Sequence, residues 1–349
     1  MHIAIISRAV FPWHGFGGLE RHVEAQSRHL VAAGHRVTLF TSPPHQPPGR
    51  QPDDGARWEA VAYRSLPWPK RSGFVIADRL TNYRIWSHRV ASAVRARAGQ
   101  QRIDIVHAHG AAGGAYARSH RGSDPPIVLH PHGMEEFKGA GLKRLVYLPQ
   151  QRAVRRTAQA ATVILVPDAS MSPEVIRFLR VDVAKTRWLP NAIDLPEPPG
   201  HDGPDGMWEG IEKRLGVDSG ASWFIAVGRL ERNKGRDVLL AALEKLARTE
   251  ESGDALARWR VLVVGDGSER GYLETRCREL GLADRVCFAG LLSDEELAAA
   301  YRNARWFVHP TLYEGSSLVT LEAMAHGLPV IASRVGGIPD RSLRRRQER

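Results

Sequence analysis

Short apolar runs alternate with longer helix-like segments along the whole chain. The runs are rich in Val, Ile and Leu, and the longer segments carry apolar residues at helical spacing. The predicted strands are residues 3–6, 37–40, 103–106, 127–129, 163–166, 223–227, 261–264, 286–288, 306–308 and 330–333. The predicted helices include residues 19–33, 75–98, 142–161, 236–247, 294–302 and 317–325. Such alternation predicts an α/β fold with parallel sheets.

The same pattern starts again in the second half of the chain. Residues 196–206 are rich in Pro, Gly and Asp, which is typical of a linker. A length of 349 residues is enough for two domains. We therefore predict a first domain at residues 1–195, a linker at 196–220 and a second domain at 221–349.

Composition limits the class of protein. Hydrophobic residues make up 43% and charged residues 25%, as in ordinary globular proteins. No apolar run approaches the roughly 20 residues that cross a bilayer, and the N-terminus is predicted to be a strand rather than a signal peptide. Cys277 and Cys287 are too few for a disulfide framework. A cytoplasmic location is the expectation.

The net charge of +11 suggests an anionic partner. Nucleic acid is not favoured, because no zinc-finger spacing or aromatic RNA-binding signature accompanies the charge. The predicted helix at 142–161 is basic, and a peripheral contact with an anionic membrane is one use that its charge allows. A solvated face is the more usual explanation for such a helix. Its basic residues are Lys143, Arg144, Arg152, Arg155 and Arg156.

Candidate chemistry is concentrated in residues 309–333. Glu314 lies in a predicted loop, and Glu322 lies eight residues later on a predicted helix. Between them, Ser316 and Ser317 follow a glycine at the start of the helix, where backbone N–H groups bind anions. This layout suits a nucleotide sugar, which has a diphosphate in the middle and hydroxyls at both ends. Taken alone, each glutamate is more often a solvated residue, because short motifs are weak evidence.

Two further loops follow predicted strands. Arg229 and Lys234 come after residues 223–227 and could clamp a diphosphate. Gly17 and Gly18 come after the first strand, where glycines let a phosphate or sugar approach the backbone. The spacing is not GxGxxG, so a dehydrogenase is poorly supported, and a plain tight turn is the alternative for the two glycines.

Four histidines follow two neighbouring predicted strands. We expect His107 and His130 to be satisfied packing residues, and His109 and His132 to face a ligand. Ligands of open α/β sheets collect at the carboxyl ends of strands. A metal is not expected, because no carboxylate or cysteine completes a ligand set at suitable spacing.

The motifs together resemble one family. They are GFGGLERHV at 15–23, DIVHAH at 104–109, PHG at 131–133, LPNAID at 189–194, VGRLERNKG at 227–235, VVGDG at 263–267, FAGLLSDEEL at 288–297 and YEGSSLVTLEAMAHGLPVIAS at 313–333. In this order the chain resembles a family 4 glycosyltransferase. The resemblance implies the GT-B fold, with two Rossmann-like domains facing across a cleft. It also implies transfer of a sugar from a nucleotide diphosphate to an acceptor, with retention and without a metal. The absence of an Asp-x-Asp motif agrees with the last point.

The resemblance also assigns roles. Gly18 would approach the donor diphosphate, and His132 would lie near the donor sugar and the acceptor. Arg229 and Lys234 would neutralise the diphosphate, and Glu314 would bind sugar hydroxyls. The remaining donor contacts would be the distal phosphate at Ser317 and Leu318, the ribose at Glu322, and the base at Gly290 and Leu291.

Some features depart from the family. Ser316 and Ser317 stand where relatives commonly have Pro or Phe followed by Gly. After residue 340 the sequence becomes arginine-rich, and we expect a truncated second domain with reduced activity. The alternatives are a natural short form, a non-catalytic chain, a nucleotide-sugar epimerase and a nucleic-acid binder. The acceptor is expected to be a glycan, a lipid or a small molecule, and the sequence identifies neither it nor the donor.

Overall fold

The chain forms two compact units. The computed structural model describes residues 1–15, 17–44, 55–67, 75–138, 145–196, 205–217, 220–249 and 259–339. The first unit is Met1–Asn191 and the second is Ala192–Arg349. The boundary lies close to the predicted end of the first domain at residue 195.

The first unit is built on one parallel sheet. Its strands are β1 (His2–Ile6), β2 (Arg36–Thr41), β3 (Arg57–Ala60), β4 (Ile105–His109), β5 (Ile127–His130), β6 (Val163–Val166) and β7 (Thr186–Trp188), in the order β3-β2-β1-β4-β5-β6-β7. Its helices are α1 (Gly18–Ala32), α2 (Val75–Gln100), α3 (Gly114–Arg118), α4 (Glu135–Lys138), α6 (Leu148–Ala160) and α7 (Ser172–Leu179). A 3₁₀ turn, η2 (Gly110–Gly113), joins β4 to α3.

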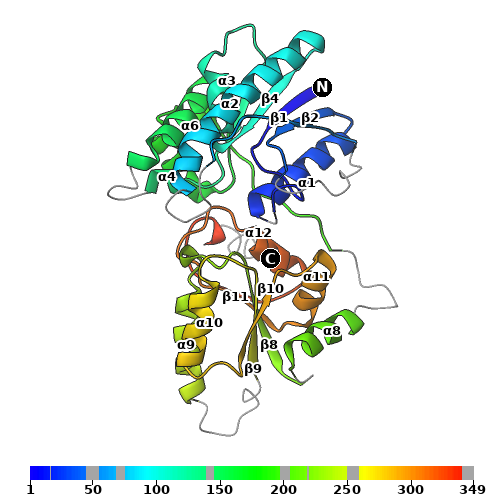
Figure 1. Cartoon of the computed structure of the whole chain (residues 1–349), viewed down its shortest axis with the longest axis vertical. Coiled ribbons are helices and arrows are strands. Elements are labelled where there is room, and N and C mark those ends of the chain that lie inside the picture. Colours follow the sequence, from blue (N-terminus) through cyan, green and yellow to red (C-terminus); the bar gives the residue numbers. More distant parts are fainter. Residues whose placement is uncertain are drawn as a thin grey trace. The chain divides into compact units, whose positions relative to one another are not determined.

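Both faces of this sheet are buried. Along β1, Ala4 and Ile6 contribute to the core that includes Trp86 of α2. Ile3 and Ile5 point the other way, into the core that includes Val23 of α1. Figure 1 shows α2, α3 and α6 on one side of the sheet and α1 on the other. Burial on both faces explains why the strands are continuous apolar runs.

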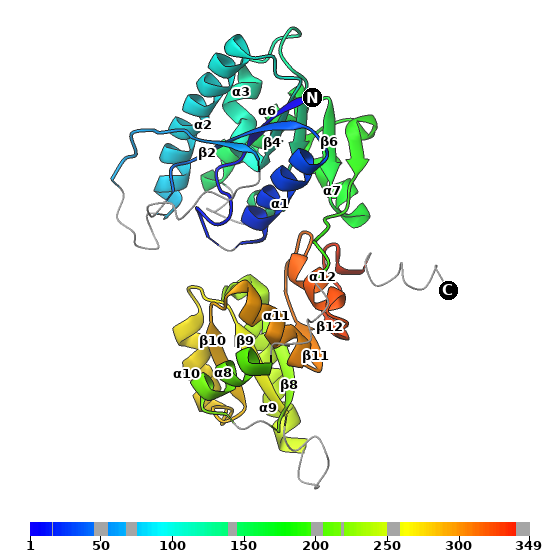
Figure 2. The same cartoon turned by 90° about the vertical axis from the view of Figure 1, so that its right-hand side faces the viewer.

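The second unit repeats this architecture with a smaller sheet. Its strands are β8 (Ser222–Val227), β9 (Trp259–Val264), β10 (Val286–Gly290), β11 (Trp306–His309) and β12 (Val330–Ala332), in the order β10-β9-β8-β11-β12. Its helices are α8 (Asp205–Leu215), α9 (Arg236–Thr249), α10 (Arg270–Glu279), α11 (Asp294–Asn303) and α12 (Leu318–Ala325). Figure 1 shows α9 and α10 on one side of the sheet and α8 and α11 on the other, and Figure 2 shows α12 beside β11 and β12.

The strand order reverses once in each sheet. In the first unit the reversal lies between β1 and β4, and in the second it lies between β8 and β11. The loops that leave the carboxyl ends of two such strands diverge to opposite faces and leave a crevice. These loops carry most of the residues that the sequence singled out.

The predicted α/β class is confirmed, and the predicted linker is wrong in part. The segment 196–220 contains α8, whose Trp208 and Ile211 are buried against Trp223 in the core of the second unit. The many Gly and Asp residues of this segment made the apolar positions of α8 hard to recognise in the sequence. The edge strands β3 and β7 were also missed, because they are short and polar.

Two sequence predictions fall partly outside the described residues. The basic helix expected at 142–161 is α6, Leu148–Ala160, and Lys143 and Arg144 are not described. Residues 340–349, on which the expected truncation rests, are not described either. Among the helices of the described ranges, none combines the length and apolar character that a membrane crossing requires.

Candidate active site

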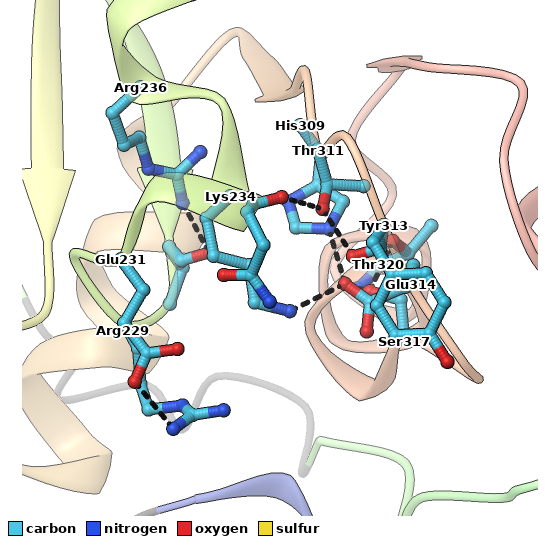
Figure 3. Close-up of polar contacts among 12 residues, drawn as sticks. Arg229, Glu231, Lys234, Arg236, His309, Thr311, Tyr313, Glu314, Ser317 and Thr320 are labelled. Carbon is cyan, nitrogen blue, oxygen red and sulfur yellow. Dashed lines mark hydrogen bonds and ion pairs between the residues drawn. The ribbon is translucent and has the colours of Figure 1, made fainter. Parts of the chain in front are cut away.

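A partly buried ion pair joins the two loops at the reversal point of the second sheet. Lys234 ends the 3₁₀ turn η5 (Arg232–Lys234) after β8, and Glu314 lies in the loop after β11. The Lys234 Nζ atom lies 2.9 Å from Glu314 Oε2, and the two side chains are 15% and 13% exposed. Figure 3 shows both side chains pointing toward one another. The structure thus brings together two residues that are 80 positions apart.

His309, at the end of β11, contacts the same carboxylate. Its Nε2 lies 3.0 Å from Glu314 Oε2. Burial lowers the pKa of His309, so its neutral ring donates this N–H. Burial alone would raise the pKa of Glu314, but the His309 hydrogen bond and the Lys234 charge outweigh it and lower that pKa to about 2. Glu314 is therefore an ionised acceptor, and its Oε1 makes no hydrogen bond to a described residue.

The backbones of the two loops pack directly on each other. The Asn233 carbonyl accepts hydrogen bonds from the N–H groups of Leu312, at 2.9 Å, and Tyr313, at 3.3 Å. Gly235 has φ 62, and a Cβ there would collide with the carbonyl oxygen of Pro310. The position of Lys234 relative to Glu314 is therefore fixed by backbone contacts.

We expect Gly235→Ala to destabilise the chain more than Gly281→Ala. Gly281 has φ 69 and open space where a Cβ would lie. Its substitution should therefore lower the free energy of unfolding by about 1 kcal/mol, through the left-handed backbone conformation alone. Gly235→Ala adds overpacking of about 1–3 kcal/mol. Urea unfolding of both variants measures the difference, and equal losses would show that the loops do not pack as described.

Two arginines near this pair differ in their surroundings. Arg229 is 58% exposed and pairs with Glu231 at 2.6 Å, apart from the Lys234–Glu314 pair in Figure 3. Arg236, which sequence reasoning missed, is buried, and its Nη2 donates to the Val227 carbonyl at 2.8 Å. Burial lowers the pKa of Arg236 to about 10, so it stays cationic at neutral pH. A cation at the start of a helix is unfavourable because it opposes the helix dipole. An arginine at the first position of α9 was therefore the feature of the sequence that could have pointed to Arg236.

The start of α12 supplies backbone donors. Ser317 is its N-cap, and the Ser317 hydroxyl accepts from the Thr320 N–H at 3.3 Å. The first-turn N–H groups from Leu318 onward have no acceptor inside the helix. Further along, Glu322 accepts a hydrogen bond from the Tyr301 hydroxyl at 3.1 Å. Tyr301 is a second residue that sequence reasoning missed, because it lies on α11.

The other predicted donor contacts lie on loops of the second unit. Gly290 ends β10 with φ 71, and Leu291 beside it is 59% exposed. Ser316 is half-buried between Glu314 and the start of α12. These residues follow strands of the same sheet as Lys234 and Glu314.

A cavity of about 530 Å³ lies at the reversal point of the first sheet. Residues after β1, β4 and β5 line it, His109 and His132 among them. Gly17 caps α1 and Gly18 begins it, and a Cβ at Gly17 would collide with the Glu20 carboxylate. The lining consists of Ser7, Arg8, Ala9, His14, Leu19, Glu20, Ser42, Tyr83, His109, Gly110, Ala111, Pro131, His132, Glu136 and Gln150.

Histidine rings form a connected group beside this cavity. His109 Nδ1 lies 2.7 Å from His132 Nε2, and His109 Nε2 lies 3.1 Å from the Gln26 side-chain oxygen. His132 has φ 58, an unusual backbone conformation that is frequent at functional sites. Burial lowers the pKa of His109 and His132 well below the ordinary value, so both rings are neutral.

The prediction that His107 and His130 are packing residues was right about their burial, but it was wrong that their ring nitrogens are all hydrogen-bonded. Both are buried, but His107 Nε2 and both ring nitrogens of His130 have no hydrogen-bond partner among the described residues. His22 of α1 packs edge-on against His130, with ring centroids 4.8 Å apart. Sequence reasoning missed His22, because it lies on another element.

The imidazoles of His22, His109, His130 and His132 could hold a metal, since their ligand atoms lie within 4.8 Å of one another. The expectation against a metal did not consider His22. However, the His130 and His132 rings are stacked, with centroids 4.0 Å and planes 10° apart. Imidazole lone pairs lie in the ring plane, so these two rings cannot both point at one ion without rotating. The absence of a metal remains a prediction.

Comparison with known families decides the identity. The family model described as Glycosyltransferase Family 4 matches residues 16–197, which is more than half of the 349 residues. The chain belongs to Glycosyltransferase Family 4. A second model, described as Glycosyl transferases group 1, matches residues 209–341. The first match falls largely on the first unit and the second match falls on the second unit.

The relatives of this family 4 chain carry several different enzyme names. It is 28% identical over 245 residues to an uncharacterized glycosyltransferase of Methanocaldococcus jannaschii, covering 62% of this chain and 60% of the relative. It is 29% identical over 350 residues to a glycogen synthase of Mycobacterium tuberculosis, covering 92% of this chain and 75% of the relative. The chain therefore spans between three fifths and three quarters of these relatives.

Solved structures match the fold. A sucrose-phosphate synthase from Thermosynechococcus elongatus has a TM-score of 0.74 and 23% identity, over 97% of this chain and 82% of that one. The two parallel sheets with flanking helices are those of the expected GT-B fold. At this identity the likeness concerns the fold alone.

Proposed function

We propose that the chain transfers a hexosyl-type sugar from a nucleotide diphosphate to an acceptor, with retention of anomeric configuration. The observation that carries this proposal is the partly buried Lys234–Glu314 pair at the reversal point of the second sheet, in a family 4 chain. A fixed cation beside an ionised acceptor suits a ligand that has phosphates and hydroxyls in sequence.

The proposed chemistry is stabilisation of the leaving group. The bond from the anomeric carbon to the diphosphate breaks through an oxocarbenium-like state, and negative charge grows on the diphosphate. Lys234 and Arg229 neutralise that charge, together with the first-turn N–H groups of α12 at Ser317 and Leu318. The acceptor oxygen bonds to the same face of the sugar, and its proton passes to the departing phosphate.

The remaining contacts orient the donor. Glu314 Oε1 accepts a hydrogen bond from a hydroxyl of the sugar, because Oε2 already accepts hydrogen bonds from Lys234 and His309. Glu322, which accepts a hydrogen bond from Tyr301, also accepts hydrogen bonds from the ribose hydroxyls. Gly290 and Leu291 contact the base. Ser316 lies beside the distal phosphate. On the acceptor side, Gly17 and Gly18 approach the diphosphate. Neutral His132 binds a hydroxyl, and His109, whose two ring nitrogens already contact His132 and Gln26, orients the His132 ring.

We further propose that no divalent metal acts at the diphosphate. Lys234 and Arg229 supply the positive charge there, supported by the start of α12. Initial rates should therefore be the same with no added metal and with millimolar Mg²⁺ or Mn²⁺. A rate that depends on either ion would contradict this part of the proposal.

The decisive experiment is a donor screen on the full chain. UDP-glucose, ADP-glucose, GDP-mannose and their nucleoside diphosphates are tested for thermal stabilisation, and the sugars also for slow hydrolysis. We expect at least one nucleotide to raise the melting temperature and its sugar to be hydrolysed. No shift and no hydrolysis with any donor would count against a transferase.

A further inference from the structure

Arginines from three helices surround a second cavity in the first unit. The cavity measures about 170 Å³ and lies between α2, α3 and α6. We call it the arginine pocket, after Arg84 of α2, Arg118 of α3, and Arg152 and Arg156 of α6. Among the described residues that line it, none is acidic. None of the catalytic or donor-binding roles described above involves these arginines, although Arg152 and Arg156 belong to the basic helix for which a membrane contact was considered.

The floor of the arginine pocket is neutral and tightly packed. Ser87 Oγ accepts from the Ala115 N–H at 3.2 Å and donates to the Ala112 carbonyl at 3.2 Å, which fixes α2 against the start of α3. A Cβ at Gly114 would collide with Ala153 of α6. The helices that carry the arginines are therefore held close together, so their charges converge on one place.

Within the described ranges, these arginines have no ion-pair partner of the kind that several other helical arginines have. On other helices, surface arginines pair with a glutamate four residues away, as in Arg28–Glu24, Arg248–Glu244 and Arg270–Glu274. All four pocket arginines are exposed, and none makes an ion pair with a described residue. Arg152 and Arg156 are themselves four residues apart, a like-charge spacing that destabilises a helix by about 0.2–0.5 kcal/mol.

We propose that the arginine pocket binds a phosphate group. An anion would relieve the repulsion among the guanidinium groups, and phosphate offers the several oxygens that planar guanidinium forks recognise in pairs. A carboxylate has fewer oxygens and less charge, so it would engage fewer of the four. A neutral sugar could accept hydrogen bonds from the arginines but would not offset the repulsion among their charges.

The arginine pocket adjoins the 530 Å³ cavity. Tyr83, Ala111 and Gln150 line both spaces. A single molecule could therefore place its phosphate among the arginines and a hydroxyl beside His109 and His132. Given the transferase function proposed above, the ligand is an acceptor that carries a phosphate, either free or as a lipid headgroup.

Calorimetric titration of the full chain with inorganic phosphate tests the site without donor or turnover. We expect saturable binding to the wild type and a loss of at least roughly tenfold in affinity for Arg118→Gln/Arg152→Gln, because each removes a charge-assisted contact. Arg89→Gln is the matched control, since Arg89 is an exposed arginine of α2 that does not line the pocket. No binding to the wild type, or equal affinity in the double variant, overturns the proposal.

A second arm identifies the source of the phosphate. Sedimentation with phosphatidylglycerol vesicles is compared with phosphatidylcholine vesicles, for the wild type and the same variants. Binding to the anionic vesicles that is lost in Arg118→Gln/Arg152→Gln identifies a lipid headgroup. Phosphate binding without that vesicle dependence identifies a free phosphorylated acceptor. Because neither arm uses turnover, the pocket can stand or fall separately from the transferase proposal.

Discussion

Lys234→Ala should reduce kcat/KM for glycosyl transfer by roughly 10³-fold or more, because it removes a fixed cation from the departing diphosphate. The expected loss exceeds that for a surface charge, since the Lys234 side chain is only 15% exposed and charges interact more strongly where solvent screens them less. Initial rates with the donor found in the screen measure the effect. Lys234→Arg should recover part of it, because the charge returns with a different shape.

The control for this variant is Lys245→Ala, an exposed lysine on α9 of the same unit. It should leave kcat/KM unchanged. Circular dichroism and melting temperature show whether Lys234→Ala is folded. A folded Lys234→Ala chain with near wild-type kcat/KM would remove Lys234 from the mechanism.

Glu314→Gln should reduce kcat/KM by roughly 10²-fold, through loss of an ionised acceptor for the donor sugar. The amide keeps the size of the side chain, so packing is preserved. Part of the loss arises because Lys234 and His309 no longer have a charged partner. Glu244→Gln, at an exposed pair with Arg248 on α9, is the control and should be near neutral.

The same carboxylate makes stability depend on pH. Its pKa falls from 4.5 to about 2 in the folded chain, and 1.36 kcal/mol per unit makes the difference worth about 3 kcal/mol. Because the folded-state pKa is the lower one, this contribution is complete above pH 4.5 and is lost as the pH falls toward 2.

Urea unfolding at pH 7 and at pH 4 measures this contribution. The free-energy gap between wild type and Glu314→Gln should be smaller at pH 4 than at pH 7, while the gap for Glu244→Gln should change little. A Glu314→Gln gap that is independent of pH would mean that the carboxylate is not held by Lys234 and His309.

Errors in the sequence predictions have local causes. Segment 196–220 was expected to be a linker because Pro, Gly and Asp dominate it, yet Trp208 and Ile211 anchor α8 in the core. His130 was expected to be a satisfied packing residue, but its ring nitrogens have no partner among the described residues. In both cases a residue that packs against the segment, Trp223 or His22, lies on another element.

Local pattern determined the elements and the order of motifs, because the period of apolar residues depends only on neighbours along the chain. That was enough for the α/β class, the division into two units and the family. Only the tertiary structure decided which loops meet. Lys234 and Glu314 are 80 positions apart, and they pair because β8 and β11 are adjacent while β9 and β10 lie on the other side of β8. Strand order depends on how helices cover the sheet, and no local spacing encodes it. The arginine pocket has the same origin, since its charges converge only when α2, α3 and α6 pack together.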